Sequence, residues 1–366
     1  MPRHKPLIHL VAAARPNFMK IAPLYHELVR QKWSRPYFVH TGQHYDENMS
    51  AAFFSDLRLP VPDVHLGVGS GTHAEQTGGV MMAYERVLLR HRPDFVVVAG
   101  DVNSTLACAL TARKLDLPLG HLEAGLRSFD WHMPEEINRR LTDALADLLW
   151  TPSRDADRNL LREGILAERI IRVGNIMIDS FELLREKIES REAWKKIGLE
   201  PKAYGVVTLH RPSNVDRKDR LERILKALDR LATRLPLVFP IHPRTKAKIK
   251  EFGLHQILKK SGRIFFVEPL RYIEFMSFVI KSRLVITDSG GVQEETTYLD
   301  IPCLTLRETT ERPITITRGT NKLVKSSDLD GCFEKILSGD WPRTGRLEFW
   351  DGRTALRVAE SLQANL

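Results

Sequence analysis

The residues with the clearest chemical potential lie in a glycine-rich turn between an apolar strand and a polar helix. The segment from Leu284 to Glu295 reads LVITDSGGVQEE. Gly290 and Gly291 would let the backbone approach an anion closely, because the free N–H groups of a helix's first turn attract negative charge. Ser289 would add a hydroxyl, and Glu295 a carboxylate for a sugar hydroxyl. The segment therefore indicates a phosphate site, with an ordinary turn capped by Ser or Asp as the alternative.

Three acidic residues in the first half of the chain lie where strands end or a helix begins. Asp101 follows the apolar strand Asp94–Ala99, and Glu123 follows the strand Leu117–His121. Because the carboxyl ends of parallel strands meet at one edge of a sheet, both carboxylates are expected at the same rim. Glu135 opens a later helix and is the third candidate. Helix capping by Asp101 and stabilisation of a helix's first turn by Glu135 are the alternatives.

Basic residues and histidines occupy similar positions. Arg15 and Lys20 lie at the end of the first strand and in the helix after it, where open α/β sheets bind ligands. His210 and His242 each follow a strand in the second half, and Arg312 comes after the last predicted strand. A shared cleft would combine these residues with the acids. Cations and backbone amides suit a diphosphate, and the acids with His210 suit proton transfer.

The sequence predicts no metal and no cofactor. No His, Cys or Asp grouping has convincing metal-ligand spacing. The glycine-rich turn is not a Walker A sequence, and the first strand-to-helix turn, AAARPN, lacks G-x-G-x-x-G, so a classical dinucleotide site is not expected. The cysteines Cys108, Cys303 and Cys332 are far apart, which indicates reduced thiols in a cytoplasmic protein.

Length and composition indicate a two-domain globular protein. The chain has 366 residues and is 43% hydrophobic, and domains typically hold about 150 residues. Lys and Arg exceed Asp and Glu by 55 to 46, for a net charge of +9. That charge permits an anionic partner, either a nucleic acid or a phosphorylated small molecule, and taken alone it would suit a nucleic-acid-binding module. Because the charge is dispersed and forms no basic tract with interleaved aromatic residues, a solvated surface with a few site residues is the better account, and no nucleic-acid partner is expected. No apolar run is long enough to span a membrane, and the first residues are expected to form a core strand rather than a signal peptide.

Short apolar runs alternate with amphipathic helical segments, which is typical of parallel βαβ units. The predicted fold class is α/β, with two Rossmann-like parallel-sheet domains facing a central cleft. We expect an N-terminal domain over residues 1–174 and a C-terminal domain over residues 175–349, with a helix at 350–366 packing back on the first. The predicted strands are Leu7–Ala13, Tyr37–His40, Asp94–Ala99, Leu117–His121, Asp147–Trp150, Arg169–Val173, Tyr204–Leu209, Leu237–Ile241, Ile264–Val267, Leu284–Thr287 and Pro302–Leu306.

Taken together, the motifs resemble the non-hydrolysing UDP-N-acetylglucosamine 2-epimerases over essentially the full length. The segments that carry the resemblance are ARPNFMKIAPL, TGQHYD, AGDVNST, HLEAGLRS, MPEEINRR, TLHRPSNVD, PIHPRT, TDSGGVQEE and TTERPITITRGTNKLV. Each is weak alone, whereas their order and joint occurrence are specific. The resemblance implies the two-domain fold of GT-B glycosyltransferases with UDP bound by the C-terminal domain, residues 175–349. It also implies a UDP-sugar substrate, a homodimer, no cofactor, and a role in supplying polysaccharide synthesis.

The resemblance also implies a mechanism and residue roles. UDP leaves C1 as the C2 proton is removed, giving a bound 2-acetamidoglucal, and UDP then re-adds while a proton reaches the opposite face. Two faces require different acid or base groups, which explains several acids around one sugar. By motif matching, the catalytic groups are Asp101, Glu123, Glu135 and His210. The substrate-binding residues are Arg15, Lys20, His242, Phe275, Ser289, Gly290, Gly291, Glu295 and Arg312, with Phe275 beside the uracil.

Some positions depart from the family pattern. Tyr45, Pro212 and Ser213 lie in segments that help to form the site where UDP-N-acetylglucosamine activates many members, so substrate activation is not expected here. Ala99 and Ile314 replace a common His and Glu. These changes leave open a modified substrate, such as a UDP-2,3-diacetamido-glucuronic acid. A GT-B glycosyltransferase would use the same nucleotide cradle, and a hydrolysing epimerase shares the motifs less closely.

Overall fold

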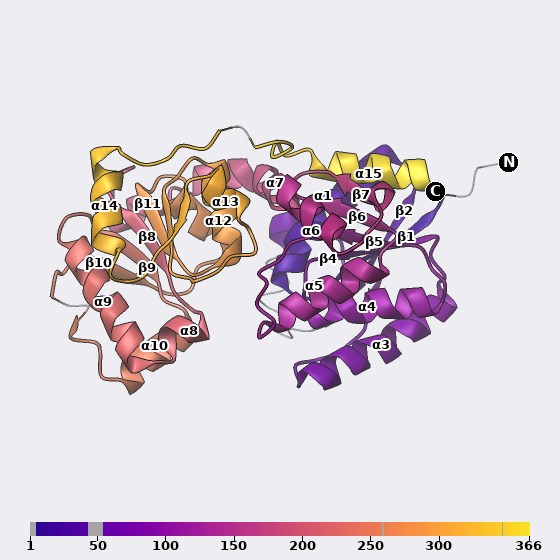
Figure 1. The fold of residues 1–366 in the computed structure, drawn as a ribbon, viewed down its shortest axis with the longest axis horizontal. Coiled ribbons are helices and arrows are strands. Elements are labelled where there is room, and N and C mark those ends of the chain that lie inside the picture. The colour runs from indigo at the N-terminus through magenta and orange to yellow at the C-terminus, as the bar shows by residue number, and fades with distance from the viewer. Residues whose placement is uncertain (1–4, 43–53, 258–259, 346) are drawn as a thin grey trace. The chain divides into compact units, whose positions relative to one another are not determined.

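A computed structural model describes residues 5–42, 54–257, 260–345 and 347–366. The chain divides into two compact units (Figure 1). Unit 1 contains Met1–Leu183 and returns with Glu348–Leu366, and unit 2 contains Leu184–Leu347.

The core of unit 1 is a parallel sheet in the order β3-β2-β1-β4-β5-β6-β7. Its central strands are fully buried, as the run FVVVA of β4 requires, because side chains on both faces of a parallel sheet are covered by helices. The strands are β1 Leu7–Ala12, β2 Arg35–His40, β3 Val64–His65, β4 Phe95–Ala99, β5 Leu119–Leu122, β6 Leu148–Thr151 and β7 Ile170–Arg172.

Helices cover both faces of this sheet (Figure 1). Helices α3, α4 and α5 pack in sequence on one face, while α1 and the C-terminal α15 pack against each other on the opposite face. The indole Nε1 of Trp150 in β6 donates to Ser361 Oγ of α15 at 2.9 Å. The helices are α1 Arg15–Gln31, α3 His73–Arg90, α4 Asn103–Lys114, α5 Pro134–Leu145, α6 Arg154–Arg162, α7 Ile176–Arg191, which continues into unit 2, and α15 Thr354–Asn365.

Unit 2 repeats the architecture with a parallel sheet in the order β10-β9-β8-β11-β12-β13. Its core is formed by the strands together with the apolar faces of α9 and α14. The strands are β8 Gly205–Thr208, β9 Leu237–Pro240, β10 Ile264–Val267, β11 Leu284–Thr287, β12 Cys303–Thr305 and β13 Asn321–Leu323. The helices are α8 Pro212–Val215, α9 Lys218–Ala232, α10 Pro243–Glu251, α11 Tyr272–Val279, α12 Gly290–Tyr298, α13 Ile314–Thr317 and α14 Leu329–Ser338.

Each sheet has a point where the strand order reverses, and this point positions the candidate site. In unit 1, β2 and β3 lie on one side of β1, and the next strand along the chain, β4, lies on the other side of β1. In unit 2 the corresponding neighbours are β8 and β11, where Thr208 pairs with Thr287. Loops at the carboxyl ends of such neighbouring strands diverge, and the crevice between them is where open α/β sheets bind ligands.

The α/β class with two parallel sheets is confirmed, and the predicted strands are found with ends that match or shift by up to two residues. The two-residue strand β3 was not predicted. From the sequence alone, the first helix is predicted over Phe18–Gln31, but it starts at Arg15, because Pro16 fits the first turn, where its missing N–H costs nothing. The sequence also predicts one helix over Asp216–Ala232, where the structure has two helices, α8 and α9. The polar β13 was not predicted.

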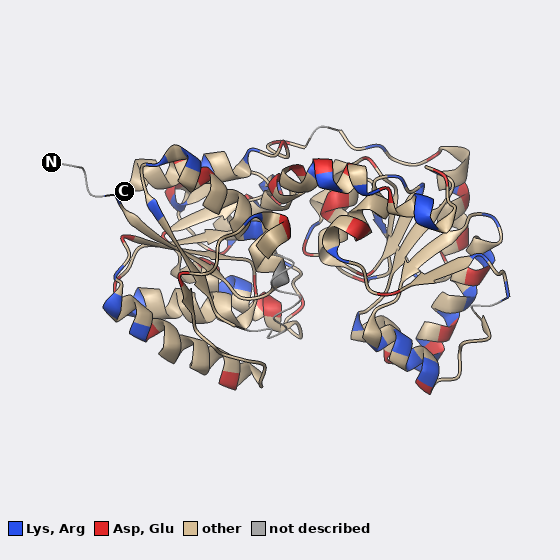
Figure 2. Ribbon diagram, turned by 180° about the vertical axis from the view of Figure 1, so that it is seen from behind, with Lys and Arg blue, Asp and Glu red and all other residues tan. Residues whose placement is uncertain are grey.

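Basic and acidic residues are interspersed along the helices of both units (Figure 2). Cys108, Cys303 and Cys332 are buried free thiols. In the described part of the chain, no helix is both long and apolar enough to cross a membrane.

Candidate active site

In unit 1, a buried ion pair lies at the point where the strand order reverses. Lys20 of α1 donates from Nζ to Glu123 Oε2, at the end of β5, and only 8% and 5% of the two side chains are exposed. Gly100, which follows β4, lies next to this ion pair, and a Cβ on Gly100 would lie 2.6 Å from Lys20 Nζ. Only glycine allows this approach, so the backbone turn and the ion pair form one unit.

The backbone of Glu123 adopts a conformation that is rare for a residue with a side chain. Its φ is +73°, in the left-handed region. The amides of Glu123 and Ala124 both donate to the carbonyl of Trp150 in β6, at 3.1 and 3.0 Å, which holds the turn closed. Strained backbone of this kind persists where neighbouring structure enforces it, and it is concentrated at functional sites.

Asp101 reaches the same edge without capping the helix that follows. The N-cap of α4 is Val102, so the capping interpretation of Asp101 is wrong. Instead, Asp101 Oδ2 accepts from Arg139 Nη1 of α5 at 2.5 Å, and about 31% of the aspartate side chain stays exposed. Arg139 is in turn fixed by Glu136, at 2.8 Å. The carboxylate is therefore oriented by a cation while remaining accessible.

Glu135 and Glu136 have opposite environments although they are adjacent. Glu135 is exposed and lies one turn before Arg139 on the same face of α5, as i and i+4 residues do. Glu136 is buried, which by itself raises its pKa, but hydrogen bonds from Ser128 and Arg139 bring that pKa below its ordinary value. The buried Glu136 is thus a structural anion that the sequence did not single out.

Beneath these turns lies a buried chain of charged and polar groups that sequence reasoning missed. His121 of β5 donates from Nε2 to the Gly100 carbonyl at 2.8 Å, and its Nδ1 lies 2.6 Å from Asp143 Oδ1. Asp143 Oδ2 accepts from the Gly125 amide at 3.1 Å and lies 2.7 Å from Arg127 Nη2. Burial raises the pKa of Asp143, but His121 and Arg127 bring it below the ordinary value. One carboxylate thus ties together the turns that carry Asp101 and Glu123.

In unit 2, the glycine-rich segment forms the start of α12, with Ser289 at the N-cap position. The Ser289 side chain makes no capping hydrogen bond, which leaves its hydroxyl unused by the helix. A Cβ on Gly290 would lie 2.6 Å from Glu311 Oε1 and 2.8 Å from Arg312 Nη1, whereas a Cβ on Gly291 would meet nothing within 4 Å. Open space therefore lies in front of Gly291, at the positive end of the helix dipole.

A cluster of buried charges supports this helix start. Arg312 lies 2.8 Å from Glu294 Oε2 and also pairs with Glu311. Burial raises the pKa of Glu311, but Arg312 and Arg307 outweigh it and hold that pKa far below the ordinary range. Glu311 is therefore an anion that fixes the position of the Arg312 guanidinium beside Gly290.

Glu295 lies one turn further along α12 and differs electrostatically from its neighbours. It is buried and accepts a hydrogen bond from the Tyr272 hydroxyl of α11 at 2.7 Å. Burial, with the adjacent Glu294, raises the pKa of Glu295 to about 7, against the opposing effects of Tyr272 and Arg312. Phe275, half-buried, follows Tyr272 by one turn of α11. The two predicted nucleoside contacts thus come from adjacent helices.

His210 is held by a buried aspartate that the sequence reasoning did not recognise. Its Nδ1 lies 2.9 Å from Asp288 Oδ1, and 41% of the imidazole side chain is exposed. Burial raises the pKa of Asp288, but contacts with His210, Arg211 and Asn214 bring it below the ordinary value. The His242 ring centroid lies 5.6 Å from that of His210. An Asp-oriented imidazole with its other nitrogen directed away is suited to proton transfer.

Some predicted positions are not described. Arg15 begins α1, but its side chain is outside the described residues, as are Tyr45 and the rest of its segment from residue 43. Within the described ranges, no group of three or more His, Cys, Asp or Glu side chains is arranged to hold a metal ion.

Comparison with known proteins identifies relatives over nearly the whole chain. Residues 26–363 match the family model described as UDP-N-acetylglucosamine 2-epimerase. The UDP-N-acetylglucosamine 2-epimerase of Methanocaldococcus jannaschii is 44% identical over 364 residues, covering 97% of this chain and 98% of its own. The UDP-2,3-diacetamido-2,3-dideoxy-D-glucuronate 2-epimerase of Pseudomonas aeruginosa is 42% identical over 357 residues, covering 96% and 98%.

The fold comparison agrees. A crystal structure of the Methanocaldococcus jannaschii enzyme in complex with UDP-GlcNAc and UDP has a TM-score of 0.87 to this chain at 40% identity, covering 98% of this chain and 99% of that one.

Proposed function

The chain belongs to the UDP-N-acetylglucosamine 2-epimerase family, and we propose that it inverts C2 of UDP-N-acetylglucosamine to give UDP-N-acetylmannosamine. The observation that carries the proposal is that each of the two sheets presents, by itself, a different kind of edge. One sheet presents Asp101 and Glu123 where its strand order reverses, and the other presents the open start of α12 beside Arg312.

The proposed reaction is elimination followed by re-addition. A base removes the C2 proton while the C1–O bond breaks and its electron pair leaves with UDP, which gives a 2-acetamidoglucal. UDP then re-forms the bond at C1 as a proton reaches the other face of C2. Asp101, Glu123, Glu135 and His210 are the proposed proton donors and acceptors. Lys20 pairs with Glu123, and Arg139 pairs with Asp101, so each acid is held in place by a neighbouring cation.

UDP is retained by the second unit in this proposal. Ser289, Gly290, Gly291 and Arg312 would bind the diphosphate, because amides at a helix start and a fixed guanidinium stabilise a departing anion. The nucleoside and the remaining substrate contacts are assigned to Arg15, Lys20, His242, Phe275 and Glu295. Retention matters because a released glucal would end the catalytic cycle.

The test is incubation with UDP-N-acetylglucosamine in deuterated water, read by NMR. Formation of UDP-N-acetylmannosamine with deuterium at C2 of the recovered nucleotide sugars supports the proposal. Transfer of the sugar to an acceptor with no deuterium incorporation would establish a glycosyltransferase instead. Release of free N-acetylmannosamine and UDP would establish a hydrolysing epimerase.

UDP-2,3-diacetamido-glucuronic acid is the second candidate substrate, because the Pseudomonas relative is 42% identical to this chain, as is the UDP-N-acetylglucosamine 2-epimerase of Methanococcus maripaludis. The ratio of kcat/KM for the two substrates decides between them. A homodimer, a cytoplasmic location and a role in polysaccharide synthesis are further parts of the proposal that rest on family resemblance.

A further inference from the structure

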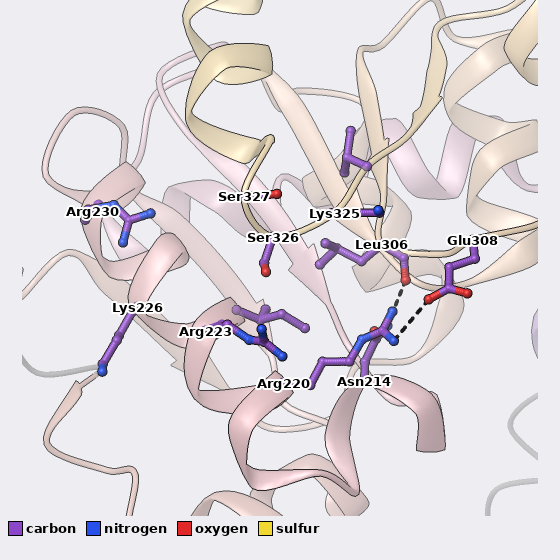
Figure 3. Close-up of a pocket in the computed structure, with 12 residues that line it drawn as sticks. Asn214, Arg220, Arg223, Lys226, Arg230, Leu306, Glu308, Lys325, Ser326 and Ser327 are labelled. Carbon is purple, nitrogen blue, oxygen red and sulfur yellow. Dashed lines mark hydrogen bonds and ion pairs between the residues drawn. The ribbon is translucent and has the colours of Figure 1, made fainter.

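Unit 2 contains a pocket that the proposed reaction does not use. Its volume is about 390 Å³, and it lies beside α9 (Figure 3). None of the proposed UDP-binding residues lines it. Its walls are formed by Asn214, Arg220, Arg223, Ile224, Lys226, Arg230, Leu306, Glu308, Val324, Lys325, Ser326 and Ser327.

The lining is strongly basic. Four of its cations, Arg220, Arg223, Lys226 and Arg230, lie on one face of α9, and Lys325 lies in the segment after β13 (Figure 3). Glu308 is the one acidic residue among those that line the pocket. Ser326 adds a hydroxyl, whereas the hydroxyl of Ser327 donates to Asp328 Oδ1 at 3.0 Å.

The carboxylates that pair with the four α9 cations would compete only weakly with a phosphate group for these cations. The partner of Arg220 is Glu308, at a long 3.4 Å, and the other three pairs on α9 are also exposed ion pairs. Such pairs contribute only about 0–1 kcal/mol. A phosphate group accepts two parallel hydrogen bonds from a guanidinium, and its dianion outcompetes a single exposed carboxylate.

The floor is apolar, formed by Ile224, Leu306 and Val324, all of which are almost fully buried. A basic rim above an apolar floor suits a ligand with phosphate groups on a small organic body. We propose that this pocket binds a phosphorylated small molecule, and that its occupancy changes the affinity of unit 2 for UDP. The change in UDP affinity rests on the proposed function, because it assumes that UDP binds at α12.

The first connection between this pocket and the proposed diphosphate site at α12 is the segment after β12. Glu308 contacts Arg220 in the pocket, while the preceding residue, Arg307, is buried on the other side and donates from Nη2 to Glu311 Oε2 at 2.8 Å. Glu311 fixes Arg312 beside Gly290. A phosphate that takes Arg220 from Glu308 therefore alters the segment that anchors the proposed diphosphate contact.

A second connection runs through Asn214. Its Nδ2 donates to the Leu306 carbonyl at 2.9 Å and to Asp288 Oδ2 at 3.1 Å, and Asp288 orients His210. Both partners are acceptors, which fixes the orientation of the amide. The same pocket wall thus contacts the support of His210 as well as the support of Arg312. Coupling between two such sites is reciprocal: each ligand changes the affinity of the other by the same factor.

The binding test uses isothermal titration calorimetry on the full chain with pyrophosphate as the probe, first with the α12 site saturated by UDP. We expect one pyrophosphate to bind per wild-type chain, and its affinity to fall at least tenfold in Arg220→Gln/Arg223→Gln. The matched control is Arg217→Gln/Arg234→Gln, which removes the same charge from the same helix region outside the pocket and should retain wild-type affinity. Equal weakening in both double variants, or no binding to the UDP-saturated wild type, overturns the proposed site.

The coupling test measures UDP affinity with and without pyrophosphate. The quantity compared is the ratio of the UDP dissociation constants with and without pyrophosphate. In the Arg220→Gln/Arg223→Gln variant, this ratio reports only direct competition of pyrophosphate with UDP at α12. We expect the ratio of the wild type to differ from that of the variant by at least threefold. An identical ratio in both proteins overturns the coupling. Failure of UDP to bind at all would instead contradict the proposed function, so the two failures are distinguishable.

Discussion

Replacing Gly291 with alanine separates a phosphate cradle from an ordinary helix cap. A Cβ at this position meets nothing within 4 Å, and the residue is not in the left-handed region, so the fold tolerates alanine. Alanine also reduces the freedom of the unfolded chain and favours the helix by about 0.5–1 kcal/mol. The free energy of unfolding should therefore stay constant or rise by up to about 1 kcal/mol.

The same methyl group stands where the proposed diphosphate approaches the amides of α12. Loss of one hydrogen bond to a charged group costs about 1.5–3 kcal/mol. At 1.4 kcal/mol per factor of ten, the dissociation constant for UDP should rise roughly 10- to 150-fold. A glycine that the fold does not need would thus be needed for binding.

Gly290→Ala is the comparison variant. Its Cβ would collide with Glu311 and Arg312, both largely buried, so the variant should lose stability as well as UDP affinity. Urea denaturation and calorimetry with UDP measure the two quantities. If Gly291→Ala binds UDP within twofold of wild type, the cradle interpretation fails and the turn is only a cap.

Three further predictions concern the acids and His210. Asp101→Asn and Glu123→Gln should each lower turnover at least a hundredfold while calorimetry shows UDP affinity within threefold of wild type; lost UDP binding with normal turnover per bound enzyme would contradict their roles. Because the pKa of Glu295 is raised from 4.5 to about 7, the native state binds the extra proton, so its stabilising effect is present below pH 4.5 and is lost as pH rises through 7. Between pH 4.5 and pH 7, the free energy of unfolding of Glu295→Gln should rise by about 3 kcal/mol relative to that of the wild type. A difference between the two proteins that stays constant over this pH range would refute the raised pKa of Glu295. Asp288→Asn should lower kcat by about 10²- to 10⁴-fold with little change in UDP affinity, as expected when His210 loses its orienting anion; an unchanged kcat would show that His210 needs no orientation.

The sequence was sufficient for the architecture because each strand and its following turn is a local pattern. The run FVVVA before Gly100 and the run LVIT before the glycine pair both predict strands that end at a ligand-binding edge. Polar short strands such as β13, with the sequence NKL, lack that pattern and depend on pairing with β12. They could not be recognised locally.

The partners of the site residues depend on distances that no local pattern encodes. Lys20 and Glu123 are 103 positions apart, and His210 and Asp288 are 78 apart, yet each pair forms one unit in the fold. Asp101 satisfies the rule for a helix cap by position, and only its contact with Arg139 excludes that role. Residue type and strand end therefore predicted the candidates, while burial and pairing defined their charge.

The central claim is that UDP leaves C1 and returns, and positional isotope exchange tests it most directly. UDP-N-acetylglucosamine carrying oxygen-18 in the bridge between C1 and the β-phosphorus is incubated with the enzyme, and the recovered substrate is analysed by phosphorus NMR. Once UDP is free in the site, the terminal oxygens of its β-phosphate become equivalent by rotation. The account predicts that oxygen-18 moves into the non-bridging positions during epimerisation. Epimerised product with all of the label still in the bridge would contradict it.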